Sequence, residues 1–295
     1  MATGSTDKVR IALVGCGRIM PAHLWGYKRL KEAGYERFEI TALVARRIED
    51  ALRFRKRGEG PGPREQAMPP GDPLAAPHIY LDEFQPDVEV NVYTDYREML
   101  KEERVDAVDI YASLFVHHEI AIAALEAGKH VMVEKPMGIT VRACRRMCDA
   151  AERAGKVLAV AENARYGQAT RMRRWAIEQG LIGKVQMLLH GGIGGFWSPD
   201  GIIADTPWRH KKVLGGGGPT IDLGVHFFDV YRYIIGEVDE VYASVRTFEP
   251  KRYRRDELGR VLDEVDVDVD DTFFAIVHFK DGAIGQITFS WAGRG

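Results

Sequence analysis

The chain has 295 residues, of which 45% are hydrophobic and 28% charged, and its formal net charge is −2. The balance of 41 basic and 43 acidic residues gives no reason to expect nucleic acid or an anionic membrane as a partner. No apolar run approaches the roughly 20 residues that span a bilayer. The polar N-terminus argues against a secretory signal, and three cysteines favour a reducing cytoplasm over a disulfide framework.

The first predicted strand, residues 9–14, leads into the turn Gly15-Cys16-Gly17-Arg18-Ile19 and then into a helix. A glycine turn between a strand and a helix is typical of dinucleotide-binding folds, because the free N–H groups of the helix favour a pyrophosphate. Gly15 would permit the tight turn, and Gly17 would let the backbone approach the ligand. Met20 replaces the third glycine, so the motif alone fits an ordinary strand–helix turn equally well.

The second predicted strand, residues 38–44, ends in Ala45-Arg46-Arg47. NAD-binding folds usually place an acid here for the ribose hydroxyls, whereas the planar donors of arginine suit a 2′-phosphate. Arg46 and Arg47 therefore favour NADP over NAD. The alternative is that they open a solvated helix over 48–56.

Residues 58–86 contain seven prolines and separate the second strand from the third. Because the sheet pattern resumes beyond them, they are predicted to be a long surface insertion and not a linker. The insertion could be partly mobile, a lid or an oligomer contact.

Further strands are predicted at 90–93, 107–111, 131–134 and 157–161, and they alternate with helices, which indicates a parallel sheet. Lys135 follows one of these strands directly, at the edge where open α/β sheets bind ligands. His117 begins the helix 117–127 and would either face the cofactor or pack and cap the helix. The dinucleotide-binding domain is predicted to cover residues 1–161.

The second domain is predicted at 162–295, with strands at 185–190, 238–248, 272–279 and 283–289. Without alternating helices these strands indicate a mainly antiparallel open sheet in an α+β domain, and Asp281-Gly282 is predicted to form a hairpin turn. One face of the sheet should be covered by helices. The other is predicted to form a homo-oligomer contact, a dimer or tetramer, because an exposed apolar face usually needs a partner.

The richest segment of this domain is Gly215–His226, with four successive glycines. Asp222 and His226 are four residues apart, so on a helix over 221–234 they would project from one face and could exchange a proton. The glycines would bring the backbone close to a ligand. The alternative is that Asp222 caps the helix and His226 is a satisfied interior histidine. Trp208 and Trp197 suit either a sugar ring or packing under loops.

Two other acidic or basic runs are assigned no site. Asp266–Asp270 lacks the glycine and glutamate of a calcium loop and is predicted to be an exposed strand. Residues 251–255 are predicted to be a solvated basic loop. Cys144 and Cys148 have no second ligand pair at a suitable spacing, so no metal site is predicted.

Taken in order, these segments resemble the Gfo/Idh/MocA oxidoreductases (glucose–fructose oxidoreductase, inositol dehydrogenase and relatives). The resemblance covers nearly the whole chain and rests on the glycine turn, Glu134-Lys135-Pro136, Ala161-Glu162-Asn163, Arg165-Tyr166, Trp208-Arg209 and Gly216–His226. It implies a Rossmann domain followed by an α+β domain, and an NAD(P)-dependent enzyme that acts on a sugar, cyclitol or related polyol. The chain stops soon after Ser290-Trp291, where relatives normally continue, so either the sequence is shortened or the second domain is compact.

The resemblance also implies roles for individual residues. Lys135 would bind the reacting hydroxyl and the ribose, His226 would accept or donate the proton, and Asp222 would orient it or share the proton. The predicted cofactor-binding residues are Gly15, Gly17, Arg18, Ile19, Arg46, Arg47, His117, Glu134 and Lys135, with Glu134 holding the lysine charged and aimed. The predicted substrate-binding residues are Lys135, Asn163, Arg165, Trp208, Arg209, Asp222 and His226.

Two other functions of the same fold stay open. One is a glycoside-cleaving enzyme that oxidises its substrate transiently and keeps its NAD bound. The other is a non-catalytic sensor of a sugar or nucleotide, which the retention of Lys135, Asp222 and His226 disfavours.

Overall fold

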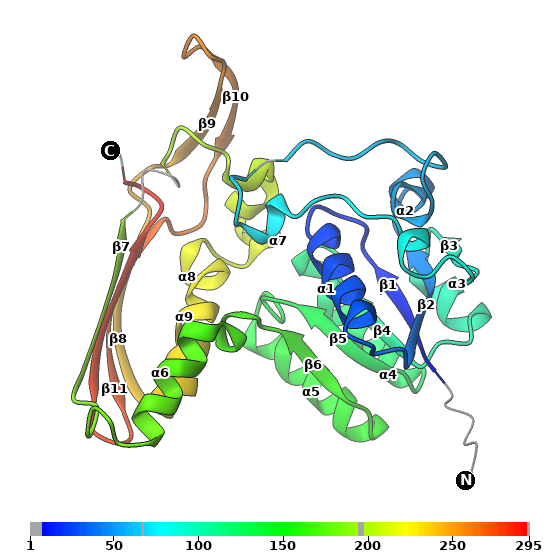
Figure 1. Ribbon diagram of the computed structural model, residues 1–295. Coiled ribbons are helices and arrows are strands. Elements are labelled where there is room, and N and C mark those ends of the chain that lie inside the picture. Colours follow the sequence, from blue (N-terminus) through cyan, green and yellow to red (C-terminus); the bar gives the residue numbers. More distant parts are fainter. Residues whose placement is uncertain (1–7, 67, 194–197, 294–295) are drawn as a thin grey trace. The chain divides into compact units, whose positions relative to one another are not determined.

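The computed structural model describes residues 8–66, 68–193 and 198–293. The chain divides into two compact units, Met1–Ala161 (unit 1) and Glu162–Gly295 (unit 2), which are described separately (Figure 1). None of the helices in the described ranges is long and apolar enough to cross a membrane.

Unit 1 is built on a six-stranded sheet in the order β3-β2-β1-β4-β5-β6. All of its pairings are parallel, which confirms the predicted Rossmann-type sheet. The strand order reverses between β1 and β4, and ligands of open α/β sheets bind at such a switch point. The strands are β1 (Val9–Val14), β2 (Phe38–Val44), β3 (Asn91–Tyr93), β4 (Ala107–Ile110), β5 (His130–Glu134) and β6 (Leu158–Ala161).

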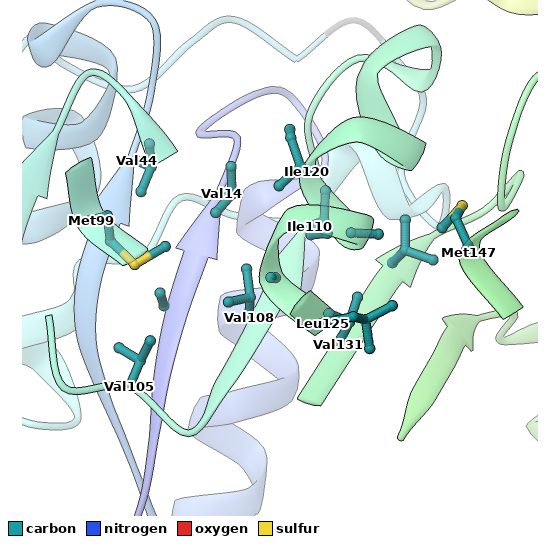
Figure 2. Packing of buried hydrophobic residues seen from close by; sticks show 14 of the residues in the cluster. Val14, Val44, Met99, Val105, Val108, Ile110, Ile120, Leu125, Val131 and Met147 are labelled. Atoms are coloured by element: carbon teal, nitrogen blue, oxygen red, sulfur yellow. The ribbon is translucent and has the colours of Figure 1, made fainter. Parts of the chain in front are cut away.

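Helices cover both faces of this sheet because alternate strand residues point to opposite sides. Ala12 and Val14 of β1 pack with α3 (Tyr96–Glu102), α4 (His117–Glu126) and α5 (Val141–Ala154), as Figure 2 shows for this cluster. Leu13 of the same strand packs on the other side with α1 (Met20–Glu32) and α2 (Ile48–Arg55).

The Pro-rich insertion is more ordered than a surface loop. It contains two short 3₁₀ helices, η1 (Pro73–Ala75) and η2 (Leu81–Glu83). Ile79 and Leu81 are buried in the core beneath α1 and α2. The side chain of Gln85 bonds both the N–H and the carbonyl of Ile40 in β2, at 3.1 and 2.7 Å. The prediction of a purely surface insertion is therefore wrong for residues 79–85, because apolar side chains in this part complete the core.

Unit 2 contains a four-stranded sheet in the order β7-β12-β11-β8. β12 and β8 pair antiparallel with β11, and β12 pairs parallel with β7, so the predicted mainly antiparallel sheet is confirmed. Gly282, with φ +94°, lies in the hairpin turn between β11 and β12. The strands are β7 (Met187–Ile193), β8 (Val238–Arg246), β11 (Thr272–Phe279) and β12 (Ile284–Ser290).

One face of the unit 2 sheet is covered and the other is open. Phe227 and Tyr231 of α9 (Gly224–Ile234) pack against Phe273 and Val277 of β11, and α6 (Gln168–Glu178) lies beside α9. On the opposite face Leu189 and Ile276 are 69% and 41% exposed.

Three local predictions for unit 2 are corrected. The helix expected over 221–234 is broken at Leu223 into α8 (Pro219–Asp222) and α9, and α7 (Lys212–Gly215) precedes them. The basic run is strand β9 (Lys251–Arg255), paired antiparallel with β10 (Val261–Asp266). The acidic run 266–270 leaves strand β10 after Asp266, and Asp268 and Asp270 accept hydrogen bonds from backbone N–H groups. Other short helices in the described residues are η3 (Leu114–Val116) in unit 1 and η4 (Ala164–Tyr166), η6 (Ile203–Asp205) and η7 (Pro207–His210) in unit 2.

Candidate functional site

The glycine turn of unit 1 lies at the carboxyl end of β1. Gly15 donates its N–H to Val44 of β2 at 2.8 Å and has φ +108°. A Cβ at Gly15 would overlap the backbone of Ala112, beyond the end of β4, whereas a Cβ at Gly17 would meet no atom within 4 Å. The absence of a side chain at Gly15 therefore lets the backbone at Ala112 pack directly against the turn. The space beside Gly17 is open. This arrangement fits a pyrophosphate at the start of α1.

The residues that follow the turn lie beside the insertion. Arg18 donates to the Glu65 carbonyl at 3.1 Å. Ile19 is the N-cap of α1, makes no side-chain capping bond, and packs partly buried against the core. The insertion thus borders the start of α1, where the predicted cofactor site lies.

The end of β2 is followed by Arg46 and Arg47, as predicted, and the first turn of α2 adds a carboxylate to which no role was assigned. Arg46 is exposed, and Arg47 bonds Asp50 in the first turn of α2 at 3.1 Å. Arg64 of the insertion bonds the other oxygen of Asp50 at 2.6 Å. Burial opposes ionisation of Asp50, but the bond from Arg47 and the charges of both arginines outweigh it and lower the pKa of this carboxyl.

Lys135 directly follows β5 and precedes Pro136 across a cis peptide bond. His117 supports this bend, since its Nδ1 lies 3.1 Å from the Pro136 carbonyl and its Nε2 2.9 Å from that of Ala112. Burial lowers the pKa of His117, which is 2% exposed. Both ring nitrogens face backbone, so the structure favours the packing alternative for His117 over the predicted cofactor contact.

A polar network that the sequence analysis missed lies beneath Glu134. His23 of α1 is 3.3 Å from Glu134, and its ring centroid is 3.9 Å from that of Tyr111. Tyr111 and Tyr27 both donate to the same oxygen of Asp109 in β4. Burial raises the pKa of Asp109 to about 6, although His23 and the two hydroxyls oppose the shift. The one available signal was a lone acid in an apolar strand.

The central feature of unit 2 is the pair His226 and Glu162. Nδ1 of His226 lies 2.6 Å from Oε1 of Glu162, which also accepts the N–H of Ala164 at 3.1 Å. Glu162 is only 9% exposed. A carboxylate only accepts hydrogen bonds, so it fixes the proton on Nδ1 and leaves Nε2 for a reacting group. Glu162 stood beside the predicted Asn163 in sequence, at the end of β6, but was assigned no role.

The other predicted residues of unit 2 form ion pairs. Arg209 bonds Asp222 at 3.2 Å, and its guanidinium lies 4.6 Å from the ring centroid of Trp208. Arg165 makes two bonds to Asp229 of α9. Because of the helix break at Leu223, Asp222 and His226 do not share one continuous helix.

Asn163 is exposed at the start of η4, and Trp197 lies outside the described residues.

The glycine run before α8 has a structural cause. A Cβ at Gly218 would overlap the carbonyl oxygen of Asp270. The Asp270 carboxylate accepts the N–H groups of Gly218 and Thr220 at 2.8 and 3.0 Å, so it holds the start of α8. Asp268 likewise accepts the N–H of Lys212 at 2.6 Å. The interpretation of these glycines as a close approach to a ligand is therefore wrong for Gly218.

Comparison with known proteins identifies the family to which the two units are similar. Residues 75–162 match the family model of the oxidoreductase family with an NAD-binding Rossmann fold, and residues 170–295 match the GFO/IDH/MocA C-terminal domain. The chain is 34% identical to levoglucosan dehydrogenase of Pseudarthrobacter phenanthrenivorans over 67% of its own length and 52% of that protein. It is 29% identical to myo-inositol 2-dehydrogenase of Thermotoga maritima over 95% of this chain and 67% of that one.

A solved structure, levoglucosan dehydrogenase in complex with NADH, superposes with a TM-score of 0.74 at 26% identity. The match covers 98% of this chain and 68% of that chain. The chain thus spans between about half and two thirds of the length of these relatives. With a Rossmann half and a C-terminal half that both match, the chain belongs to the Gfo/Idh/MocA family of oxidoreductases.

Proposed function

We propose that this chain is an NAD(P)-dependent dehydrogenase or reductase that transfers hydride between nicotinamide and a hydroxyl-bearing carbon of a sugar, cyclitol or related polyol. Residues 1–161 would bind the dinucleotide, and residues 162–295 would bind the substrate and make subunit contacts. The named activities of the levoglucosan and inositol relatives support this assignment.

The observation that carries the proposal is the Glu162–His226 pair. Oxidation of an alcohol requires a base that accepts the hydroxyl proton. The buried Glu162 carboxylate holds the Nδ1 proton of His226, so that Nε2 can accept the proton from the substrate and return it in the reverse direction. His226 is not fully interior, since its side chain is 20% exposed, which favours this role over that of a satisfied interior histidine.

The dinucleotide would supply the hydride chemistry, and the protein would supply position and charge. Gly15 and Gly17 would hold the pyrophosphate beside α1. The ammonium of Lys135 would stabilise negative charge that develops on the reacting oxygen, in either direction. Asp222 would orient the substrate or share its proton, with its carboxylate set by Arg209.

For the cofactor, we propose a preference for NADP. The β2 end presents Arg46 and Arg47 and no carboxylate before α2 begins. Separate titrations with NADPH and NADH test this choice, and tighter binding of NADH would reverse it.

We also propose self-association through the open face of the β7-β12-β11-β8 sheet. Its exposed side chains include Met187, Leu189, Phe274, Ile276 and Ile284, and apolar area of this kind is normally covered by a partner. All three cysteines are free thiols, which supports a cytoplasmic location.

The decisive experiment is a panel of sugars, cyclitols and polyols assayed for net formation of NADH or NADPH. Lys135→Ala should abolish turnover on any substrate found while leaving cofactor affinity within a few-fold, and the exposed Lys101→Ala serves as the matched control. Normal turnover by Lys135→Ala would sink the assignment. Cleavage of a glycoside with retained cofactor and no net reduction would favour the glycoside-cleaving alternative.

A further inference from the structure

The Pro-rich insertion reaches the glycine turn through one residue, Arg64. Its Nη2 donates to Asp50 in the first turn of α2 at 2.6 Å, and its Nη1 donates to the carbonyl of Gly17 at 3.4 Å. The guanidinium thus joins two segments that are 33 positions apart in sequence (50 − 17). Neither partner belongs to the insertion.

Arg64 also lines a cavity at this point. The cavity has a volume of about 110 Å³, and its walls include Gly17, Arg18, Pro21, Arg64, Gln66 and His78. The Arg64 side chain is 28% exposed. Its two bonds use one N–H on each of two nitrogens, whereas a guanidinium carries five donors in a planar fork. A group with several acceptor oxygens could therefore bind without the loss of either contact.

The fold identifies which part of a dinucleotide would come here. In a sheet of this order the pyrophosphate lies at the start of α1, and the adenosine ribose lies beyond the end of β2. Gly17 belongs to the first of these places, and Arg47 and Asp50 belong to the second. Arg64 contacts Gly17 at the first place and Asp50 at the second, so its guanidinium lies between the expected positions of the pyrophosphate and the adenosine ribose.

The local charge favours an anion. Asp50 is shared by Arg47 and Arg64, and these three side chains sum to a net charge of +1. Asp50 holds the two guanidiniums together before a ligand arrives, which lowers the ordering cost of binding. Arginine is suited to phosphate because its fork matches two oxygens at once.

We propose that Arg64 is a cofactor-specificity residue that binds the 2′-phosphate of NADP together with Arg47. The insertion would then be the wall of the adenosine pocket, in addition to a part of the core. This inference rests on the proposed function for the kind of cofactor, but it concerns binding alone.

The test measures binding of NADPH and NADH by fluorescence, and competition by adenosine 2′,5′-bisphosphate and by AMP. Wild-type protein should bind the bisphosphate about 10-fold or more tighter than AMP. Arg64→Gln should weaken NADPH and the bisphosphate by about 10- to 100-fold, as expected for loss of a charge-assisted bond, with NADH and AMP within about 2-fold. Arg64→Lys, which keeps the charge, should recover part of the loss.

Arg57→Gln is the matched control, because Arg57 directly precedes the insertion, is 75% exposed and pairs with Glu83 inside it. Equal losses for NADPH and NADH in Arg64→Gln would show a merely structural clamp and overturn the proposal, as would no loss at all. A wild-type protein that binds AMP as tightly as the bisphosphate would also overturn it. These experiments measure binding and not turnover. A failure to oxidise any sugar would therefore contradict the proposed function but would leave the conclusion about Arg64 unchanged.

Discussion

Both units place a glycine where another part of the chain comes too close for a side chain, but the close neighbour differs. In unit 1 the neighbour of Gly15 is the backbone beyond β4, and Gly17 beside it stays open. In unit 2 the neighbour of Gly218 is Asp270, whose carboxylate holds the N–H groups that begin α8. Gly218 is therefore explained by a half-buried acid of the same unit, whereas the open position Gly17 fits the proposed contact with a dinucleotide.

The largest expected effect comes from filling these two positions. Gly218→Ala should lower the free energy of unfolding by about 3 kcal/mol, the upper end for an overpacked site, because its Cβ would overlap the Asp270 carbonyl. Gly17→Ala should change the free energy of unfolding by no more than about 0.5 kcal/mol, since its Cβ meets no atom. It should weaken dinucleotide binding instead.

Urea unfolding with dinucleotide titration separates the two variants. If Gly218→Ala unfolds like wild type and loses ligand binding, the glycine run of unit 2 faces a ligand, and the proposed difference between Gly17 and Gly218 is wrong.

The acids of unit 2 also differ in what they hold: Asp268 and Asp270 accept backbone N–H groups, whereas the buried Glu162 also pairs with a histidine. Glu162→Gln keeps the size of the side chain but removes the charge that fixes the Nδ1 proton of His226. We expect a fall in kcat on the order of 100-fold, the lower end of what a positioned base contributes, with KM little changed. The exposed Glu178→Gln in the same unit should leave kcat as it is.

Nitrogen chemical shifts of the His226 ring give a readout that a merely structural role would not move. They should report a proton on Nδ1 in wild type and a mixture of tautomers in Glu162→Gln. An unchanged tautomer with unchanged kcat would reduce Glu162 to a packing residue.

Periodicity and glycine position were enough to predict the six-stranded sheet of unit 1 and the four-stranded sheet of unit 2, because each strand's burial pattern is local in sequence, but they missed the β9-β10 pair. The partners of the site were not local. Glu162 meets His226 across 64 residues, and Asp270 meets Gly218 across 52. Spacing alone suggested Asp222 as the partner of His226, on a helix that breaks at Leu223. The burial of part of the insertion was missed for a related reason. Its many prolines predicted a surface loop, although Ile79 and Leu81 are buried in the core.

The smallest expected effect concerns Asp109, a buried acid of unit 1. The hydroxyl groups of Tyr27 and Tyr111, and not backbone N–H groups, donate hydrogen bonds to its carboxylate. The pKa of Asp109 is raised to about 6, so the folded chain keeps this proton to higher pH than the unfolded chain does. Its contribution to the free energy of unfolding is therefore greatest below about pH 4, falls as the pH rises toward 6, and is lowest above that. Asp109→Asn cannot ionise and retains a carbonyl oxygen for Tyr27 and Tyr111.

The variant should therefore be more stable than wild type above pH 6, by about 1–3 kcal/mol, and similar to it near pH 4. Asp106→Asn, three residues earlier, supplies the opposite sign. The hydrogen bond from Arg10 lowers the pKa of Asp106 to about 2, so that substitution should lose stability above pH 4. Unfolding curves at several pH values would compare the two. If the stability difference between wild type and Asp109→Asn does not change between pH 4 and 6, burial does not raise the pKa of Asp109 and the prediction for this acid of unit 1 fails.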